Sequence, residues 1–262
     1  MALMMGDKNL ITCATIKWGD LYSSDDVNRL FRSVRRNTRK NLRFYCMTES
    51  SDGLDPDIIW LPLKEQSYEH RMLEAQKSAY HKRGALRKVA LFNPRIYSES
   101  DAAVLILDID VLIVDEIDSL FDYAPGQVAM RKPFGSNPKP FSYGQGSIIK
   151  IEPRLHAFLY DQMVGMPEKM VALANGSEQS YTSIVAAAHG VLSFYPESWI
   201  VSFKYHCRPK KPLNFLKTPT VPNGAKIVCF HGKPDIKEAV KGYAGDFWGL
   251  SRPAPWISSY WG

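Results

Sequence analysis

Residues 105–114 read LILDIDVLIV, an apolar run interrupted by two carboxylates, Asp108 and Asp110. The stretch before them, DAAVLIL at 101–107, has the composition of a buried strand. Side chains of an extended segment repeat every two residues, so both carboxylates are expected to point the same way. Burying two like charges side by side is costly unless something offsets them. Paired Asp oxygens suit a hard divalent cation, Mg²⁺ or Mn²⁺, which can bridge the phosphates of a nucleotide.

Strand and helix patterns alternate in the chain before this run. Short segments rich in β-branched residues predict strands at 9–18, 42–48 and 57–63. Helical periodicity predicts helices at 25–40 and 75–92, the second ending where Asn93-Pro94 disfavours continuation. Such alternation predicts parallel strands with helices on both faces. Ligands of such sheets bind beyond the carboxyl ends of the strands, which is where Asp108 and Asp110 are expected.

The second half of the chain is less regular. Apolar segments predict further strands at 127–130, 147–151 and 226–232, and helical patterns occupy 153–165, 167–175 and 178–189. A loop rich in Pro and Gly runs through 131–146, and the tail carries three tryptophans. We find no internal repeat and no low-complexity linker, so the sequence predicts one mixed α/β domain.

Composition favours a globular protein with a sizeable core. The chain has 262 residues, of which 45% are hydrophobic and 12% aromatic. No apolar stretch reaches the roughly 18 residues that span a bilayer, and the N-terminus lacks the features of a signal peptide. The four cysteines are scattered without a C-x-x-C pair, which argues against a zinc ribbon or a disulfide framework. Free thiols in a cytoplasmic enzyme are the expectation.

The net charge of +6 is concentrated in the helix expected at 25–40. Ser24 suits its N-cap, and Asp25 and Asp26 suit its first turn. Its arginines share a face opposite the apolar one, which indicates a solvated surface or a peripheral contact with an anionic membrane. Zinc-finger spacing, an RNP-like motif and tandem basic repeats are absent from the sequence, so nucleic acid is not expected as a partner. The arginines of this face are Arg29, Arg32, Arg36 and Arg39.

Three interpretations of the D-x-D remain open from the residues themselves. The acids can simply end a strand at an exposed turn, since so short a motif is common. They can belong to a haloacid-dehalogenase-type phosphatase, with Asp108 as nucleophile and Asp110 as its acid–base partner. That family normally carries its D-x-D near the start of the chain, and the later G-D-x-x-x-D form is not found here. The third interpretation is a sugar-nucleotide transferase with a cation between the acids and a diphosphate.

The remaining motifs favour the third interpretation. In chain order they are ITCATIKWGDLY, ALRKVALF, LILDIDVLIV, YGQGSIIKI, EQSYTSIV, FYPESWIVSFKYH and IVCFHGKPDI. This ordered set resembles the GT-A-fold glycosyltransferases, and among them the glycogenin-like and family-8-like enzymes, over most of the chain. The resemblance implies an α/β, Rossmann-like single GT-A domain over 1–262, with a central mixed, mostly parallel sheet flanked by helices. Residues 1–115 would form its nucleotide-binding half and 116–262 its sugar and acceptor half.

The resemblance also implies roles for individual residues. Asp108, Asp110 and His231 would hold Mn²⁺ or Mg²⁺, and Glu178 and Gln179 would lie at the transferred sugar as the catalytic pair. The donor, a nucleotide sugar and by resemblance a UDP-sugar, would be held by Thr15, Lys17, Tyr22, Lys88, Ile109, Gln145, Gly146, Ser147, Gly232 and Lys233. Ser202, Lys204 and His206 would face the acceptor. Each residue also has a structural interpretation, such as strand-end packing, helix capping or an ordinary turn.

The expected activity is transfer of a sugar to a hydroxyl of a glycan or other acceptor. The family-8-like resemblance favours retention of anomeric configuration; for inversion, Glu178 is the candidate general base. The loop at 132–143 and the tail are candidates to close over the donor. Gly144-Gln145, Glu178 and Asp235 depart from the family pattern of Asn, Asp and Trp at these places. A GT-A-like binding protein without turnover is a further alternative.

Overall fold

The computed structural model describes residues 9–79, 85–135, 144–245 and 250–261. Within these ranges the chain forms a seven-stranded sheet in the order β3-β2-β1-β4-β7-β6-β8. Strand β7 runs antiparallel to β4 and β6, and the other pairings in this sheet are parallel. The strands are β1 (Leu10–Ile16), β2 (Asn41–Thr48), β3 (Ile58–Pro62), β4 (Val104–Leu107), β6 (Val128–Arg131), β7 (Gln145–Ile151) and β8 (Leu192–Phe194).

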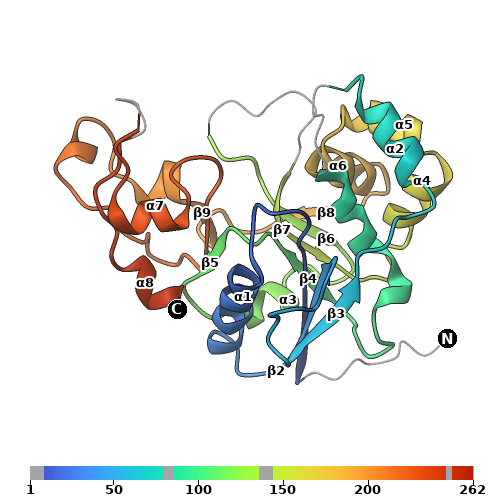
Figure 1. Cartoon of the computed structure of the whole chain (residues 1–262), viewed down its shortest axis with the longest axis horizontal. Helices are drawn as coiled ribbons and strands as arrows, with labels where there is room; N and C mark the ends of the chain where they lie inside the picture. The colour runs from blue at the N-terminus through green and yellow to red at the C-terminus, as the bar shows by residue number, and fades with distance from the viewer. Residues whose placement is uncertain (1–8, 80–84, 136–143, 246–249, 262) are drawn as a thin grey trace.

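A second, smaller sheet lies beside the first (Figure 1). In the described ranges it has three strands in the order β5-β10-β9, with β10 antiparallel to β5 and parallel to β9. Val111 and Ile113 of β5 pack toward the main sheet, whereas Leu112 packs with the C-terminal helices. Its strands are β5 (Val111–Ile113), β9 (Ile200–Ser202) and β10 (Ile227–Cys229).

Helices cover both faces of the main sheet, as the alternating pattern predicts. One face carries α1 (Ser24–Arg36) and α3 (Asp118–Asp122), and the other carries α2, η1 and α4 to α6 (Figure 1). Beyond the small sheet lie α7 (Ile236–Lys241) and α8 (Ile257–Tyr260). The predicted α/β class, with a mostly parallel central sheet between helices, is confirmed. The elements of the second face are α2 (Glu69–Gln76), η1 (Ala85–Phe92), α4 (Phe158–Gly165), α5 (Pro167–Ala174) and α6 (Glu178–Ala188).

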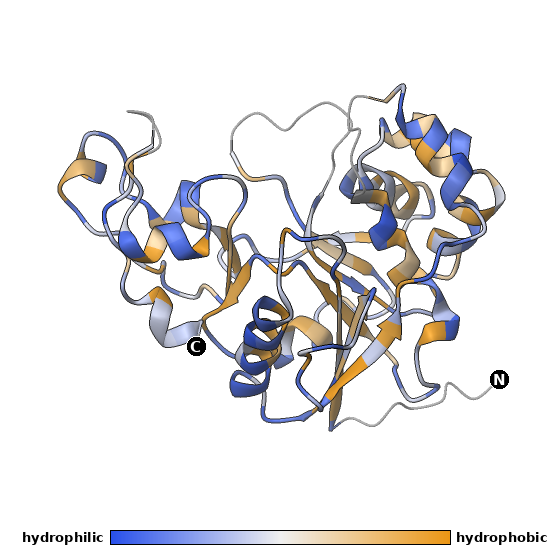
Figure 2. Ribbon diagram, viewed as in Figure 1, coloured by the Kyte–Doolittle hydropathy of each residue, from blue (hydrophilic) through white to orange (hydrophobic). Residues whose placement is uncertain are grey.

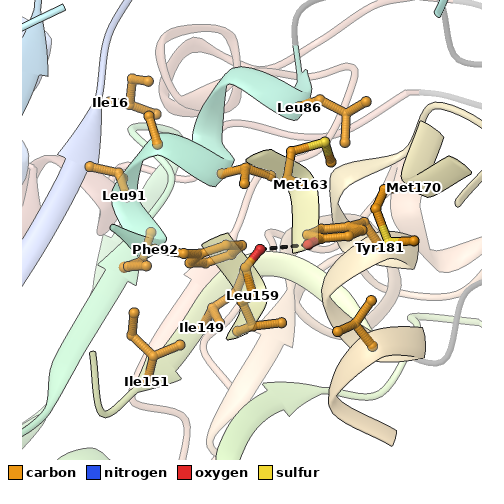
Figure 3. Close-up of a cluster of buried hydrophobic side chains, with 14 of the residues drawn as sticks. Ile16, Leu86, Leu91, Phe92, Ile149, Ile151, Leu159, Met163, Met170 and Tyr181 are labelled. Atoms are coloured by element: carbon orange, nitrogen blue, oxygen red, sulfur yellow. Dashed lines mark hydrogen bonds between the residues drawn. The ribbon is translucent and has the colours of Figure 1, made fainter. Parts of the chain in front are cut away.

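The strands are apolar on both sides because both faces of the sheet are covered. In β4, Leu105 and Leu107 pack toward α1, while Val104 and Ile106 pack toward η1 and α4. Figure 3 shows the second of these cores, where the hydroxyl of Tyr181 donates to the carbonyl of Leu159. Figure 2 shows hydrophobic strands inside and hydrophilic helix faces outside.

The run at 105–114 is two strands rather than one. β4 ends at Leu107 in the main sheet, residues 109 and 110 form a turn, and β5 begins at Val111 in the small sheet. Asp108 and Asp110 therefore lie where the chain crosses from one sheet to the other. Apolar periodicity does not reveal this break, because both sheets bury their strands on two sides.

The single α-helix predicted over 75–92 is also replaced by two separate elements in the structure. α2 begins earlier, at Glu69, and ends at Gln76, and η1 is a 3₁₀ helix. Leu86, Val89 and Phe92 recur every three residues and are all fully buried, which is the period of a 3₁₀ helix rather than an α-helix. Between these two elements, residues 77–79 continue as turns and a bend, and residues 80–84 lie outside the described ranges. The helix predicted at 153–165 begins later, at Phe158, after a run of turns.

The basic helix α1 forms as predicted but with shifted ends. Its N-cap is Ser23, not Ser24, because Ser23 and Asp26 complete a capping box. The helix ends at Arg36, so Arg39 is outside it. Arg29 and Arg36 donate to the backbone carbonyls of Trp261 and Tyr260, which places part of the arginine face against α8. The predicted membrane contact of this helix stays a prediction.

Two further expectations concern membranes and thiols. Among the described helices, none has the length and hydropathy needed to cross a membrane. All four cysteines lie in described ranges and are buried free thiols. The free thiols match the prediction, and the cytoplasmic location stays a prediction.

Candidate active site

A cavity of about 460 Å³ opens at the carboxyl edge of the main sheet. Three stretches of chain meet there because of the topology: the end of β1, the turn after β4, and the start of β7. Since β7 is antiparallel to β4, its first residues lie beside the last residues of β4, and Leu107 pairs with Ile148. The first turn of α6 completes the wall. This is the edge at which ligands of such sheets are expected.

Most of the predicted donor-site residues line this cavity together. Asp108, Ile109 and Asp110 come from the turn between the two sheets, and Lys88 comes from η1. The remaining predicted residues in the wall are Lys17, Tyr22, Gln145, Gly146, Ser147, Glu178 and Gln179.

The two aspartates differ in their surroundings. Asp108 donates its backbone N–H to the carbonyl of Ser147 and accepts a hydrogen bond from Lys88. Asp110 is more deeply placed, and the hydroxyl of Tyr22 is hydrogen-bonded to its carboxylate. Burial, together with the neighbouring charge of Asp108, raises the pKa of Asp110 to about 7. The cavity thus holds a closely spaced pair of acids whose full ionisation needs a nearby positive charge.

Lys88 supplies part of that charge. Its side chain is buried, and Nζ lies 2.7 Å from Asp108 Oδ1 and 3.9 Å from Glu178 Oε2. Nζ also donates to the carbonyl of Gly146. Burial lowers the pKa of Lys88, but the charges of Asp108 and Glu178 outweigh this and raise it above the ordinary lysine value. Lys88 is therefore a charged group that links η1, the D-x-D turn and α6.

Glu178 and Gln179 reach the cavity from the first turn of α6. Glu178 is buried, and its Oε1 accepts a hydrogen bond of 2.9 Å from Thr182. Burial raises the pKa of Glu178, against the lowering effect of Lys88. The Gln179 side chain accepts from the N–H of Gly146 at 3.2 Å. A Cβ on Gly146 would lie 2.7 Å from Glu178 Oε2 and 3.0 Å from Gln179 Cβ, so only glycine allows this approach.

The loop after β1 forms the opposite wall. The Lys17 ammonium donates to the carbonyl of Gly19, whose positive φ of 61° permits the turn. Thr15 is an exception among the predicted donor residues. It is fully buried, and its hydroxyl donates to the carbonyl of Leu107 at 2.8 Å, so it fixes β1 against β4 without lining the cavity.

His231 lies close to the D-x-D along the backbone but belongs to another cluster of side chains. Phe230 donates its N–H to the carbonyl of Asp110, which places His231 one residue beyond that contact. Its imidazole stacks between Phe134 and Tyr205, and Nε2 lies 2.7 Å from Ser202 Oγ. Burial, followed by the charges of Lys204 and His206, lowers its pKa, so it is a neutral imidazole near pH 7.

The other predicted residues near His231 are on the surface or in its cluster. Lys233 does not line the cavity; Nζ pairs with Glu238 at 2.6 Å and Asp235 at 3.2 Å, beside the capping box that begins α7. Gly232, with a positive φ of 77°, makes the turn before it. Lys204 and His206 are exposed, and the His206 ring accepts the N–H of Ser202.

The cavity chemistry fits a divalent cation at Asp108 and Asp110. Both carboxylates line the same wall, and burial together with the charge of Asp108 raises the pKa of Asp110, an effect that a bound cation would oppose. The His, Cys, Asp and Glu side chains of the described ranges do not form a group of three or more arranged around one metal position. The carboxylate pair is thus preformed, whereas the third predicted ligand, His231, is engaged with Ser202.

Four residues of the cavity were not predicted. Ile16 lines it from the end of β1, Trp18 and Leu21 line it from the loop after β1, and Ser177 lines it just before α6. Leu21 is 82% exposed, which is unusual for leucine and puts an apolar side chain at the rim. Their place beside Lys17, Tyr22 and Glu178 in the sequence was the available signal. Of the candidate lid at 132–143, residues 136–143 lie outside the described ranges, and its closure stays a prediction.

Neither the protein-family models nor the curated proteins include a match to this chain. Solved structures do match. The galactosyltransferase LgtC, in complex with donor and acceptor sugar analogs, is 14% identical with a TM-score of 0.61, over 86% of this chain and 89% of LgtC. The glycosyltransferase GlyE of Streptococcus pneumoniae TIGR4 is 13% identical with a TM-score of 0.58, over 86% of this chain and 56% of GlyE.

Mouse xyloside xylosyltransferase 1 also matches, at 10% identity and a TM-score of 0.54, over 86% of this chain and 98% of that enzyme. At sequence identities this low, the structural similarity shows a shared fold and nothing finer. The expected GT-A architecture is thus confirmed: this chain has the fold of GT-A-type glycosyltransferases.

Proposed function

We propose that this protein is a glycosyltransferase that takes its sugar from a nucleotide donor bound in the cavity at the carboxyl edge of the sheet. The observation that carries the proposal is the meeting of Asp108, Asp110, Lys88 and Glu178 in one cavity of a GT-A fold. The similar solved structures support it, since their names describe galactosyl- and xylosyltransferases. The relation to glycogenin-like and family-8-like enzymes is part of the same proposal.

Asp108 and Asp110 would hold Mn²⁺ or Mg²⁺, with His231 as the third ligand after it leaves Ser202. When bound, such an ion neutralises charge on the departing diphosphate. Lys17, Tyr22 and Ile109 would contact the nucleoside side of the donor, by their place at the rim after β1 and at the D-x-D turn. A UDP-sugar is the proposed donor.

The sugar would lie against the wall formed by β7 and α6. Strand β7 begins with Gln145, Gly146 and Ser147, and its start is held in place because the Gln145 side chain accepts from the N–H of Ser147 at 2.9 Å. Glu178 and Gln179 would then meet the sugar and its anomeric carbon, with Glu178 kept in place by Thr182 and Lys88. Lys88 would hold Asp108 and Glu178 at a fixed separation as charge develops on the leaving group.

Transfer to a hydroxyl acceptor with retention is the proposed outcome, and Glu178 is the candidate base if the reaction inverts. The phosphatase alternative expects the D-x-D after the first strand, whereas here three strands of the sheet precede β4. Gly232 and Lys233 would join the site when a diphosphate is present, after Lys233 breaks its ion pairs with Asp235 and Glu238.

A panel of UDP-sugars with Mn²⁺ tests the proposal. A transferase releases UDP slowly by hydrolysis and stops when the ion is chelated or Asp110 is changed to Asn. Release of inorganic phosphate from p-nitrophenyl phosphate, with no UDP from any donor, would identify a phosphatase instead. Thermal stabilisation by UDP-sugars without product would identify a binding protein. With an acceptor in hand, proton NMR of the first product distinguishes retention from inversion.

A further inference from the structure

A loop at the edge of the molecule exposes leucines and buries an asparagine. The loop follows η3 (Phe203–Cys207), and its ends are joined by a hydrogen bond of 3.0 Å from Thr220 N to Cys207 O. In its η4 turn (Leu213–Phe215), Leu213 is 43% and Leu216 is 79% exposed, while Asn214 is 1% exposed. In most folded proteins leucine is buried and asparagine is exposed, which is the opposite arrangement.

The turn is held in this orientation by its own hydrogen bonds. The N–H groups of Leu216 and Lys217 donate to the carbonyl of Leu213 at 3.0 and 2.8 Å. Asn214 Nδ2 donates to the carbonyl of Leu250 at 3.1 Å, which fixes the buried side of the turn on the C-terminal segment. Trp256 Nε1 donates to the carbonyl of Pro219 at 2.9 Å, which fixes the C-terminal end of the loop. The leucines are therefore presented outward by a braced turn.

The same loop lies within a strongly basic segment. From 198 to 234 the sequence contains no Asp or Glu, and its cations are Lys204, Arg208, Lys210, Lys211, Lys217, Lys226 and Lys233. Lys210 and Lys217 are exposed, and no ion pair within the described ranges includes either of them. By contrast, Lys226 pairs with Glu116 and Lys233 with Glu238, away from the turn. Figure 2 shows the η4 turn at the left edge of the molecule in light orange and blue, next to blue segments.

We propose that this turn docks the protein on an anionic lipid surface, with Leu213 and Leu216 entering the interface and the lysines beside them contacting the headgroups. Apolar side chains flanked by cations bind such surfaces through apolar burial and charge attraction together. A protein partner would need a shape that the structure does not specify, whereas a bilayer needs the protruding, braced and acid-free turn seen here.

This surface is distinct from the basic helix α1. Arg29 and Arg36 of α1 contact the carbonyls of α8, and Arg29 and Arg32 pair with Asp25. Arg29, Arg32 and Arg36 of α1 thus have acidic or backbone partners within the protein, and α1 presents its apolar residues to the core. The turn at 213–216 instead presents Leu213 and Leu216 to the same solvent as the flanking Lys210 and Lys217. The proposal does not depend on the reaction in the donor cavity.

Vesicle co-sedimentation of the full chain tests the proposal. The probes are phosphatidylcholine vesicles and vesicles in which about one third of the lipid is phosphatidylglycerol. We expect binding to the anionic vesicles, little to the neutral ones, and weaker binding when salt rises above about 0.1 M. Leu213→Ser/Leu216→Ser should reduce the bound fraction at least about tenfold, and Lys210→Glu/Lys217→Glu should do the same.

Two matched variants serve as controls. Leu155→Ser/Leu173→Ser removes two other exposed leucines, and Arg32→Ser/Arg35→Ser removes charge from α1. Both should bind vesicles like the wild type. Because the changed side chains are exposed or, for Arg32, half-buried, circular dichroism should show each variant folded. The lysine variant gives a second test if the leucine variant does not fold.

Three results would overturn the proposal. The first is no binding of the wild type to anionic vesicles at low salt, and the second is undiminished binding by both loop variants. The third is loss of binding in the α1 variant while the loop variants still bind. Equal binding to single-stranded DNA and to vesicles, lost in the lysine variant and kept in the leucine variant, would identify the surface as a polyanion site and would also reject it.

Discussion

Lys88 and Asp108 form an ion pair at the wall of the cavity, with 2.7 Å between Nζ and Oδ1, and the lysine is almost completely buried. The 3₁₀ geometry of η1 makes this contact possible, because it sends Leu86, Val89 and Phe92 into the core while Lys88 lies on another row of the helix. The pair joins the second core to the D-x-D turn, so it has consequences for stability as well as for the site.

Replacing Lys88 with Met should destabilise the protein by about 3–5 kcal/mol, because it leaves the buried carboxylate of Glu178 and the partly exposed carboxylate of Asp108 without their cation. Urea unfolding without metal or nucleotide measures this. Lys77→Met, which removes a lysine from an exposed pair with Glu74, should leave the unfolding midpoint nearly unchanged. A Lys88→Met variant as stable as Lys77→Met would show that Lys88 is not a structural cation of the site.

Gly146→Ala should reduce turnover about 100-fold, as expected when reacting groups are displaced by about 1 Å. The added Cβ would meet Glu178 Oε2 and Gln179 Cβ, and the first turn of α6 would have to move. Steady-state release of UDP measures the effect. Gly165→Ala is the control, because nothing lies within 4 Å of a Cβ built there. Equal activity of the two variants would place the sugar away from this wall.

Asp101 should matter for folding and not for the site. It is buried at the opposite edge of the sheet, where it accepts hydrogen bonds from Thr12, Arg43, Tyr45 and the N–H of Ser98. Asp101→Ala leaves these donors unpaired and should cost about 3 kcal/mol or more of unfolding free energy. The folded fraction should keep its donor binding. Asp57→Ala, an exposed acid near β3, is the control and should unfold like the wild type.

The cysteines should be unreactive in the native protein. Burial raises the pKa of Cys46 and of Cys207 to about 12, and raises those of Cys13 and Cys229 as well. Thiolates are the reactive form, so labelling by DTNB at pH 8 should be slow until denaturant is added, when four thiols should react. Rapid labelling of the native chain would show that the cores around β1 and β10 open readily.

The sequence predicts the parts of this structure that depend on local pattern. Apolar runs locate β1, β2, β4 and β7, and a D-x-D after a buried strand locates the carboxyl edge where the cavity lies. Thr15 and Lys233 show the limit of such reasoning. Thr15 lies near the end of β1, which leads to the cavity, but its hydroxyl donates to the carbonyl of Leu107, and Lys233 pairs with Asp235 and Glu238. Both outcomes depend on partners that only the folded chain brings together.

The break between β4 and β5 is another feature that pattern does not reveal. Val111 to Ile113 are as apolar as the residues of β4, because the small sheet is covered on both sides by the main sheet and by α7 and α8. Likewise His231 follows an apolar strand as predicted, yet its imidazole is stacked between Phe134 and Tyr205 and bonded to Ser202. Long-range contacts of this kind are set by tertiary structure.

The most direct measurement of the central claim is calorimetric titration of Mn²⁺ into the full chain in the presence of UDP. The account predicts saturable uptake by the wild type, its loss in Asp108→Asn/Asp110→Asn, and weaker uptake in His231→Ala, while His206→Ala binds like the wild type. Absence of uptake by the folded wild type, or undiminished uptake by the double aspartate variant, would contradict the claim that these acids hold a cation for a nucleotide donor.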